Sequence, residues 1–385
     1  MTDVFIIGSK GIPAKYGGFE TFVEKLTELK QDQTIKYHVS CMDNDEKHFT
    51  HNMADCFNVK VPFSGPAGRI LHVARALEQT YQQIVSENMH DTVVYILGCR
   101  IGPLMKHYYK KFKKTKTKIF VNPDGLEWKR DKWNKWQKKF LRYSEKCLVQ
   151  NSDLIICDSK QIQKDMQMLF NIPEDETVYI SYGADIKPSI LEDNDSQLIS
   201  WYKEKDIKPN EYYLIVGRFV PENNYETMIS EFMKSNTQRD LVIITNIEKN
   251  KFYNELKRKT DFNNDNRVKF VGTVYDQELL KKIREKAFAY VHGHSVGGTN
   301  PSLLEGLAFT RLNLLLDVPY NKEVGGDNTF YFNKNCENLS KLINKIDDIS
   351  KKDKDVIWKK SLRRIKCYYN WSFIIAEYEK NFTRI

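Results

Sequence analysis

Short apolar runs alternate with longer segments of helical spacing along the whole chain. Near the start, the run Val4–Ile7 is followed by apolar residues that recur at helical spacing from Phe19 to Leu29. Strands that alternate with helices in this way predict parallel sheets covered by helices on both faces. The other predicted strands are Val93–Leu97, Lys118–Val121, Leu154–Cys157, Tyr212–Val216, Leu241–Thr245, Val268–Val271, Phe288–Val291 and Leu312–Leu316.

The alternation falls into two series, and the second begins at Tyr212. Between them, residues 186–210 carry two prolines and the acidic polar run Glu192–Asp195, which is typical of a linker. A length of 385 residues also favours two domains. We therefore expect an α/β protein with two doubly wound domains, residues 1–187 and 188–368. We expect residues 369–385 to form a C-terminal helix that packs back on the N-terminal domain.

The composition excludes several classes of protein. Hydrophobic residues make up 41% and aromatic residues 12%, which is too apolar for a disordered chain. No apolar stretch approaches the ~18 residues of a membrane span, and the first residues lack the basic region of a signal peptide. The seven cysteines are scattered without C-x-x-C, so we expect neither a disulfide framework nor a standard zinc site. They fit a reducing cytosol.

The formal net charge of +9 is unevenly placed. Residues 100–146 hold 16 Lys and Arg against 4 Asp and Glu, which leaves the rest of the chain slightly acidic. Within this basic segment an aromatic stripe recurs at helical spacing and includes Trp133 and Trp136. Such a stripe suits insertion at an anionic membrane, although a core-facing stripe with a solvated basic face is the alternative. No nucleic-acid-binding module accompanies the charge, so we expect no nucleic acid partner.

Two glycine-bearing turns each follow a predicted strand and open a helix. The first is Gly8–Glu20, where glycines let backbone N–H groups approach an anion at the helix N-terminus. It matches neither G-x-G-x-x-G nor the P-loop, and a tight strand–helix turn is the alternative. The second is His294–Gly306, in which Asn300 suits an N-cap and Pro301 the first helical turn. The N–H groups expected to be free before that helix belong to Gly297, Gly298 and Thr299.

Two charged residues lie at the same expected sheet edge. Arg218 directly follows the strand Tyr212–Val216, where a guanidinium can bind a diphosphate through two parallel hydrogen bonds. A structural ion pair is the alternative for a lone arginine. Glu305 lies one turn into the second helix, where it could accept hydrogen bonds from sugar hydroxyls or be merely solvated. Ligands of open α/β sheets bind at the carboxyl ends of the strands, so both positions suit a binding site.

Together these motifs resemble the retaining, GT-B-type glycosyltransferases of family 4, and the resemblance spans nearly the whole chain. The residues that carry it are Gly17-Gly18, Ser152-Asp153 with Ser159, Tyr182–Asp185, Gly217-Arg218 with Pro221–Asn223, and Pro301–Glu305. A narrower resemblance is to bacterial β-1,4-rhamnosyltransferases of capsule and cell-wall polysaccharide assembly. It is carried by Gly11–Glu20, Asn122–Arg130 and Gly297–Pro301.

The resemblance implies a GT-B fold, in which two Rossmann-like domains face a cleft that binds a nucleotide-sugar. It implies that Arg218 grips the diphosphate, that Glu305 holds the ribose, and that Gly17 and Gly18 close over the phosphates from the other domain. The other implied donor-binding positions are Asn223, Gly297, Gly298, Thr299 and Asn300.

The sequence departs from the family pattern at two positions. The usual lysine after the arginine is Asn223, which removes one positive charge from the leaving-group site. The first glutamate of the E-x7-E pattern falls on Gly297, so only Glu305 remains. Both departures resemble the rhamnosyltransferase subgroup's own pattern.

The implied chemistry requires stabilisation of the charge that builds on the nucleoside diphosphate. Preorganised amides and an arginine can supply it, and we expect no metal and no cofactor. The two Asp-x-Asp sequences, Asp43–Asp45 and Asp193–Asp195, fit solvated turns. The family implies front-face attack, with the leaving phosphate taking the acceptor proton. We place Asp124 nearest the acceptor hydroxyl, although an Asp–Gly turn is the alternative for this residue.

The resemblance therefore implies transfer of L-rhamnose from dTDP-rhamnose to a hexose, Glc or GlcNAc, on a polyprenyl-diphosphate acceptor. A family-4 enzyme with another donor, such as UDP-hexose, is one alternative, and a catalytically silent membrane-binding GT-B scaffold is another. We expect a cytoplasmic protein that is peripheral on the inner face of the cell membrane. The residues expected to face the anionic membrane surface are Lys110, Lys111, Lys113, Lys114, Trp133 and Trp136.

Overall fold

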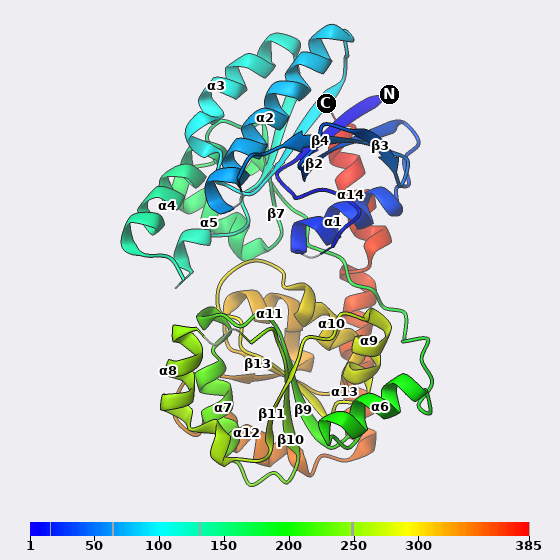
Figure 1. Cartoon of the computed structure of the whole chain (residues 1–385), viewed down its shortest axis with the longest axis vertical. Coiled ribbons are helices and arrows are strands. Elements are labelled where there is room, and N and C mark those ends of the chain that lie inside the picture. The colour runs from blue at the N-terminus through cyan, green and yellow to red at the C-terminus, as the bar shows by residue number, and fades with distance from the viewer. Residues whose placement is uncertain (16, 64, 131, 248–249, 385) are drawn as a thin grey trace. The chain divides into compact units, whose positions relative to one another are not determined.

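In the computed structural model, the chain divides into two compact units, each built on one sheet (Figure 1). The structure describes residues 1–15, 17–63, 65–130, 132–247 and 250–384. One unit combines residues 1–183 with 371–385, and the other comprises residues 184–370. We describe them as the N-terminal and the C-terminal unit.

The N-terminal unit contains an eight-stranded sheet of order β3-β4-β2-β1-β5-β6-β7-β8. Its pairings are parallel except that between β3 and β4, which is antiparallel. After β4 the chain crosses to the other side of β1 and enters β5, and ligands of open α/β sheets bind at the carboxyl ends of the strands beside such a switch point. The strands are β1 (Thr2–Ile7), β2 (Ile35–Asp43), β3 (His48–His51), β4 (Ala54–Lys60), β5 (Thr92–Leu97), β6 (Lys118–Asn122), β7 (Leu154–Cys157) and β8 (Thr177–Tyr179).

Helices cover this sheet, and the last helix of the chain is one of them. The carboxylate of Glu379 on that helix accepts hydrogen bonds from the backbone N–H groups of Gln31 and Asp32, and the ring of Tyr378 packs on Phe22. The C-terminal helix therefore belongs to the N-terminal unit. The helices are α1 (Gly18–Glu28), α2 (Gly65–Ser86), α3 (Gly102–Phe112), α4 (Lys135–Val149), α5 (Lys160–Phe170) and α14 (Trp371–Phe382), with the 3₁₀ turns η1 (Lys113–Thr115), η2 (Glu127–Lys129) and η3 (Glu174–Glu176).

The C-terminal unit contains a parallel six-stranded sheet of order β11-β10-β9-β12-β13-β14. Its strands are β9 (Tyr212–Val216), β10 (Asp240–Ile244), β11 (Val268–Gly272), β12 (Ala289–His292), β13 (Asn313–Leu316) and β14 (Phe330–Phe332). Its helices are α6 (Ser196–Lys205), α7 (Tyr225–Met233), α8 (Lys251–Thr260), α9 (Gln277–Glu285), α10 (Pro301–Phe309), α11 (Pro319–Gly325), α12 (Asn338–Asp347) and α13 (Lys351–Tyr368), with η4 (Pro221–Asn223), η5 (Phe262–Asn264) and η6 (Gly326–Asn328).

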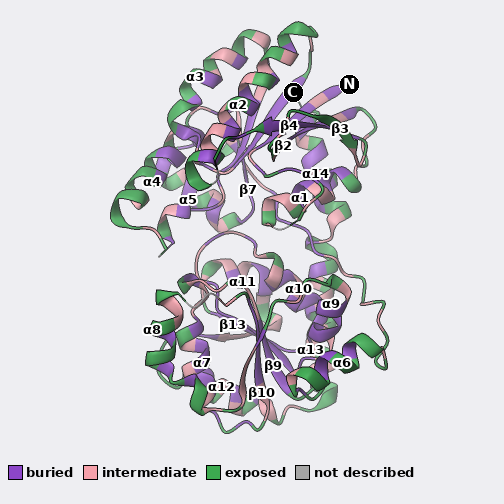
Figure 2. Cartoon of the chain, viewed as in Figure 1, coloured by how far each residue is buried: buried purple, intermediate pink, exposed green. Residues whose placement is uncertain are grey.

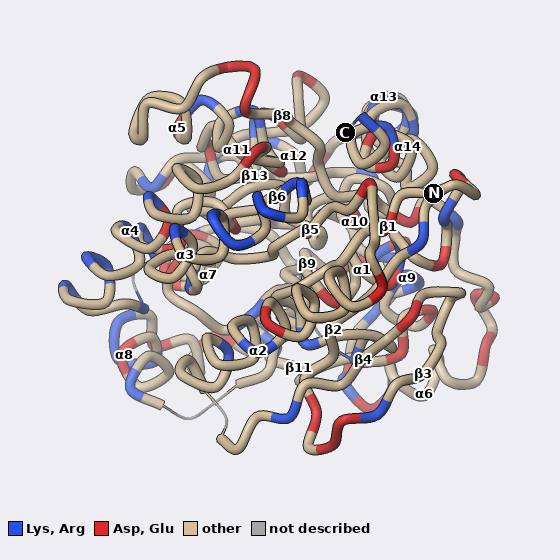
Figure 3. Tube along the Cα trace, turned by 90° about the horizontal axis from the view of Figure 1, so that it is seen from above, with Lys and Arg blue, Asp and Glu red and all other residues tan. Residues whose placement is uncertain are grey.

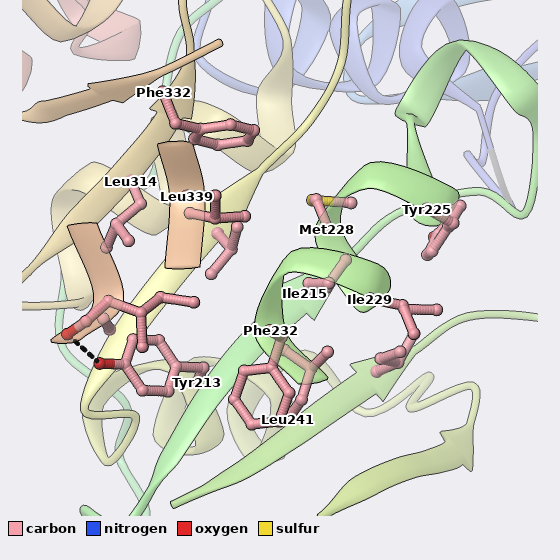
Figure 4. Packing of buried hydrophobic residues seen from close by; sticks show 14 of the residues in the cluster. Tyr213, Ile215, Tyr225, Met228, Ile229, Phe232, Leu241, Leu314, Phe332 and Leu339 are labelled. Carbon is pink, nitrogen blue, oxygen red and sulfur yellow. Dashed lines mark hydrogen bonds between the residues drawn. The ribbon is translucent and has the colours of Figure 1, made fainter. Parts of the chain in front are cut away.

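Both faces of this second sheet are buried, as the purple strands of Figure 2 show. Along β9, Tyr213 and Ile215 pack into the cluster on the side of α7 and α12, which Figure 4 shows from close by. Tyr212 and Leu214 point the other way, into the cluster that includes Trp201 of α6. A strand buried on both faces gives a continuous apolar run, which is the pattern seen in the sequence.

Residues 186–210 are not a linker, contrary to the expectation. They contain α6, capped by Asp195, and Ser189 donates hydrogen bonds from its backbone N–H to Glu285 and from its hydroxyl to the carbonyl of Glu278. The acidic run pairs with α9, where Asp193 lies 2.9 Å from the ammonium of Lys282. The apolar face of α6 consists of Leu198, Trp201 and Tyr202, and charged residues flank it on both sides in the sequence, so the segment looks polar although Trp201 is buried.

Candidate functional site

In the C-terminal unit, the carboxyl ends of β9 and β12 bring Arg218, Asn223 and His294 together. The side-chain amide of Asn223 donates to the backbone oxygen of Arg218 at 2.7 Å. Its oxygen lies 2.6 Å from Nδ1 of His294, which therefore carries the proton of this hydrogen bond. Asn223 does not supply the charge of the family's lysine, but it ties the loop after β9 to the loop after β12.

The N-terminus of α10 is fixed directly beside the end of β9. The side chain of Asn300 caps the helix by accepting the N–H of Ser302 at 2.9 Å. The hydroxyl of Ser302 donates to the backbone oxygen of Val216 at 3.0 Å. Before the helix, Gly297 has φ = 126°, a conformation that favours glycine. A helix N-terminus favours anions, and that of α10 lies at the same sheet edge as the loop that carries Arg218.

Glu305 of α10 is half-buried and paired. Its Oε2 lies 2.6 Å from Nη2 of Arg284, a side chain that is 2% exposed. The carboxylate is therefore held by α9, and the simple alternative of a solvated helix glutamate is wrong. A carboxylate with one oxygen fixed by an arginine is well placed to accept a hydroxyl on the other.

Buried polar atoms without a hydrogen-bond partner in the described part of the chain also lie at this edge. They are both carboxylate oxygens of Glu222, which is 2% exposed, and Nε2 of His292. Burial lowers the pKa of His292 to about 3, so its imidazole is neutral. A buried polar group without a hydrogen-bond partner costs about 1–3 kcal/mol of stability, and a bound ligand could supply the missing partner. The sequence motifs include Glu222 and His294 without giving either a role, and they leave out His292, although the places of these residues near strand ends were a usable signal.

The glycine turn of the N-terminal unit is held by its own helix. Glu20 accepts the backbone N–H of Lys10 at 2.8 Å, and Glu24 accepts that of Ala14, also at 2.8 Å. Gly17 caps α1 with φ = 132°, and a side chain on Gly18 would meet nothing within 4 Å. The open part of the turn is thus at Gly18, whereas Lys10 and Ala14 already have carboxylate partners. Tyr16 lies outside the described residues.

Asp124 follows β6 at the carboxyl edge of the N-terminal sheet. Its backbone N–H donates to the side-chain oxygen of Asn122 at 3.0 Å, which forms a turn of the kind that an Asp–Gly sequence favours. Its carboxylate is 38% exposed and lies 3.6 Å from Nη2 of Arg130. Asp124 is therefore both a turn residue and an accessible carboxylate.

Beside this turn, the buried carboxylate of Glu127 forms ion pairs with basic side chains. Its oxygens lie 2.8 Å from Nη1 of Arg130 and 3.0 Å from Nζ of Lys132, and it accepts the indole N–H of Trp133 at 3.1 Å. Burial by itself would raise the pKa of Glu127, but Arg130 and Lys132 together lower it. Trp133 is thus half-buried and hydrogen-bonded.

The aromatic stripe on α4 is exposed, so the core-facing alternative is wrong for three of its residues. Trp136 is 80%, Phe140 42% and Tyr143 58% exposed. Figure 3 shows basic residues along α3 and α4. Two of the lysines expected to face a membrane are already paired, Lys111 with Glu78 and Lys113 with Asp153, both at 2.5 Å.

Within the described ranges, no helix has the length and apolarity needed to cross a membrane. The same residues contain no cluster of three or more His, Cys, Asp or Glu side chains placed to hold a metal ion.

Two α/β units with doubly wound parallel sheets, one with an arginine and a capped helix N-terminus at its carboxyl edge, define the GT-B architecture. Residues 200–363 match the family model described as glycosyl transferases group 1. Residues 1–185 match a domain of unknown function, DUF1972. No curated protein matches the chain.

Solved structures of the same architecture cover the whole chain. Sucrose-phosphate synthase from Thermosynechococcus elongatus has a TM-score of 0.78 at 13% identity, over 99% of this chain and 98% of that one. HepE of Anabaena, in complex with UDP and glucose, has a TM-score of 0.74 at 14% identity over 100% of both chains. An E. coli structure described as trehalose-6-phosphate bound with UDP-2-fluoro glucose has a TM-score of 0.75 at 10% identity, over 100% of this chain and 99% of that one. At these identities the solved structures show the GT-B fold, and the group 1 match over residues 200–363 is the finding that favours a glycosyltransferase.

Proposed function

We propose that the protein is a retaining glycosyltransferase that moves L-rhamnose from dTDP-rhamnose to Glc or GlcNAc on a polyprenyl diphosphate, in bacterial surface polysaccharide synthesis. The observation that carries the transferase assignment is the attachment of the α10 N-terminus to the end of β9, beside Arg218. This arrangement presents backbone N–H groups and a guanidinium at one edge, as a nucleoside diphosphate requires. The rhamnose donor rests on the resemblance carried by Asn122–Arg130 and Gly297–Pro301.

The leaving group is stabilised without a metal or cofactor in this proposal. Arg218 binds the diphosphate, and the backbone N–H groups at the start of α10 add positive potential where charge develops. Glu305, fixed by Arg284, accepts a ribose hydroxyl. Asn223 holds the loop that carries Arg218. The remaining donor-binding positions are Gly17, Gly18, Gly297, Gly298, Thr299 and Asn300.

The transfer exchanges one bond at the anomeric carbon for another. The bond from that carbon to the phosphate oxygen breaks, and the acceptor oxygen bonds to the same face of the sugar. The acceptor proton passes to the departing phosphate oxygen, so the enzyme needs no separate base. Asp124 orients the acceptor hydroxyl through a hydrogen bond, a role that suits an exposed carboxylate at a strand's end.

A polyprenyl acceptor requires contact with a membrane, and α4 supports this part of the proposal. Exposed aromatic side chains flanked by lysines and arginines are typical of helices that lie at an anionic membrane surface. Trp136, Phe140 and Tyr143 supply the aromatic side chains on this helix. We place this surface on the inner face of the cell membrane.

The second candidate function is a glycosyltransferase that uses a donor other than dTDP-rhamnose. It is favoured by one structural neighbour, since HepE of Anabaena was solved in complex with UDP-glucose. For this chain, a UDP-hexose would occupy the same edge and use the same arginine. A catalytically silent scaffold remains the alternative from a different class.

The test is a panel of donors against synthetic lipid-diphosphate sugars, with products read by mass spectrometry. The proposal predicts a rhamnosylated product with dTDP-rhamnose and little product with UDP-glucose. Preferential use of a UDP-hexose would replace the donor assignment and keep the transferase. No product with any pair, from a protein that melts cooperatively, would favour the scaffold.

A further inference from the structure

The turn that follows β6 has an unusual backbone. Asp124, Gly125 and Leu126 have φ values of 60°, 54° and 53°, three left-handed residues in succession. Two of them carry side chains, and each such residue costs about 1–2 kcal/mol relative to an ordinary conformation. Strained segments of this kind persist only where the surroundings enforce them, and they gather at functional sites.

The carboxylate of Glu145, on α4, holds the far side of this turn. Its Oε1 accepts the backbone N–H of Leu126 at 3.1 Å, and its Oε2 accepts the indole N–H of Trp128 at 2.7 Å. On the near side, Asn122 accepts the N–H of Asp124. The turn is therefore held at both ends, at the N–H of Asp124 by Asn122 and at the N–H of Leu126 by Glu145.

Glu145 is itself held rigidly. The residue is 0% exposed, and its neighbour Ser144 donates its hydroxyl to the backbone oxygen of Cys99 at 2.5 Å. A side chain on Gly102 would lie 1.8 Å from the backbone oxygen of Ser144, so the start of α3 packs directly on the α4 backbone. The α4 backbone beside Glu145 is thus fixed by its packing on α3, and the carboxylate itself accepts the N–H groups of Leu126 and Trp128.

We propose that Glu145 is a positioning residue for the acceptor: it fixes the left-handed turn so that Asp124 is presented at the carboxyl edge of the sheet. This inference rests on the role proposed for Asp124. Burying a carboxylate costs free energy unless both of its oxygens accept hydrogen bonds. Here one oxygen accepts the N–H of Leu126 and the other that of Trp128. Burial also raises the pKa of Glu145 to about 7, despite the hydrogen bonds from Trp128 and Leu126 that favour the charged form.

The test is the variant Glu145→Gln, which keeps the size and shape of the side chain. It replaces one of the two acceptor oxygens with an NH₂ group, which cannot accept the N–H that this oxygen accepts in the parent protein. We expect kcat to fall by about 10–100-fold, the scale for misplacing a reacting group, with the donor KM unchanged. Backbone hydrogen exchange at Leu126 should become faster, a measurement that needs no substrate. Glu379→Gln is the matched control, because that buried carboxylate accepts backbone N–H groups in the loop after α1.

A double-mutant cycle with Asp124→Asn separates positioning from general support of the fold. If Glu145 acts through Asp124, then Glu145→Gln should cost less than threefold when Asp124 is already replaced. An equal loss in both backgrounds, or a kcat within threefold of the parent in Glu145→Gln, would overturn the inference. If Asp124→Asn alone leaves kcat unchanged, it is the proposed role of Asp124 that fails.

Should Glu145→Gln not fold, Trp128→Phe tests the same inference. This change removes one of the two hydrogen bonds and keeps most of the ring packing. We expect a loss of about 3–10-fold in kcat that again disappears in the Asp124→Asn background. A loss that persists there would contradict positioning.

Discussion

Arg218 is the residue on which the donor site most depends. It is exposed at the end of β9, and its backbone oxygen is held by Asn223, which is linked to His294. The loop is thus fixed, and among the residues that the structure describes no hydrogen bond or ion pair engages the exposed guanidinium. This is the arrangement expected of a side chain that binds a charged group, and it differs from that of Arg284 on α9, which is buried and paired with Glu305.

Arg218→Ala should lower turnover by about 10²–10³-fold, since it removes a donor that stabilises charge in the transition state. Arg218→Lys should rescue poorly, because an ammonium lacks the planar pair of donors. Steady-state kinetics with the preferred donor measures both. Arg311→Ala is the control, as that arginine is also partly exposed in the C-terminal unit and pairs with Asp355. A loss under threefold in folded Arg218→Ala would remove Arg218 from the leaving-group role.

Glu145 should give the N-terminal unit a recognisable dependence of stability on pH. Burial raises its pKa from 4.5 to about 7, so between these values the folded protein binds a proton that the unfolded chain does not. The free energy of unfolding therefore falls as pH rises through this range. Glu145→Gln lacks this dependence, so the Tm of the parent minus that of the variant should decrease from pH 4.5 to pH 7. A difference that is constant with pH would show that Glu145 keeps its ordinary pKa.

At the scale of elements, α4 serves two purposes with opposite faces. Its inner face supplies Leu141, Ser144, Glu145 and Leu148 to the interior, and Glu145 reaches the turn after β6. Its outer face carries Trp136, Phe140 and Tyr143. A capping box between Asn134 and Gln137 fixes where the helix begins. The membrane surface proposed here therefore lies on α4 itself, and the proposed acceptor turn is hydrogen-bonded to the same helix.

Replacing Trp136 and Phe140 by alanine should weaken binding to anionic liposomes even at low salt, because inserted aromatic rings contribute apart from charge. The Tm should barely change, since both side chains are exposed. Liposome co-sedimentation measures binding, and Tyr275→Ala is the control because this aromatic residue is 75% exposed in the C-terminal unit. Equal binding by the double variant and the parent would remove α4 from the membrane contact.

Charge should add to this contact and be screened by salt. Each basic residue near an anionic surface contributes on the order of 1 kcal/mol. Among the four lysines of the α3 end, Lys110 and Lys114 are exposed, whereas Lys111 and Lys113 pair with Glu78 and Asp153. The first two should therefore account for most of the salt-sensitive part of binding.

At the scale of the whole molecule, activity should survive EDTA. Arg218 and the N-terminus of α10 supply the positive potential that a metal supplies in other transferases. Turnover measured before and after exhaustive chelation tests this, with unchanged kcat as the expected result. Complete loss that Mg²⁺ or Mn²⁺ restores would contradict it and would bring the Asp-x-Asp sequences back into consideration.

The sequence by itself determined the class of fold and the elements that carry the donor edge. Apolar runs such as Val4–Ile7 and Tyr212–Val216 are strands because parallel strands buried on both faces must be continuously apolar. The turns after β9 and before α10 could be predicted because glycine, an N-cap asparagine and an N1 proline each have local conformational preferences that mark a turn or the start of a helix. The C-terminal helix was expected on the N-terminal domain, and α14 lies there.

Only the tertiary structure decided which polar residues are partnered and by what. Asn223 and Glu305 each depend on a residue far away in the sequence, and local spacing carries no information about His294 or Arg284. The tertiary structure also decided the place of α6, because its few buried residues are flanked by charged ones and do not form a recognisable apolar pattern in the sequence. Nor does the sequence show the strain at Asp124–Leu126, because that backbone is enforced by Glu145, a residue of another element. Local patterns specify elements, whereas burial and pairing arise only when elements far apart in the chain pack together.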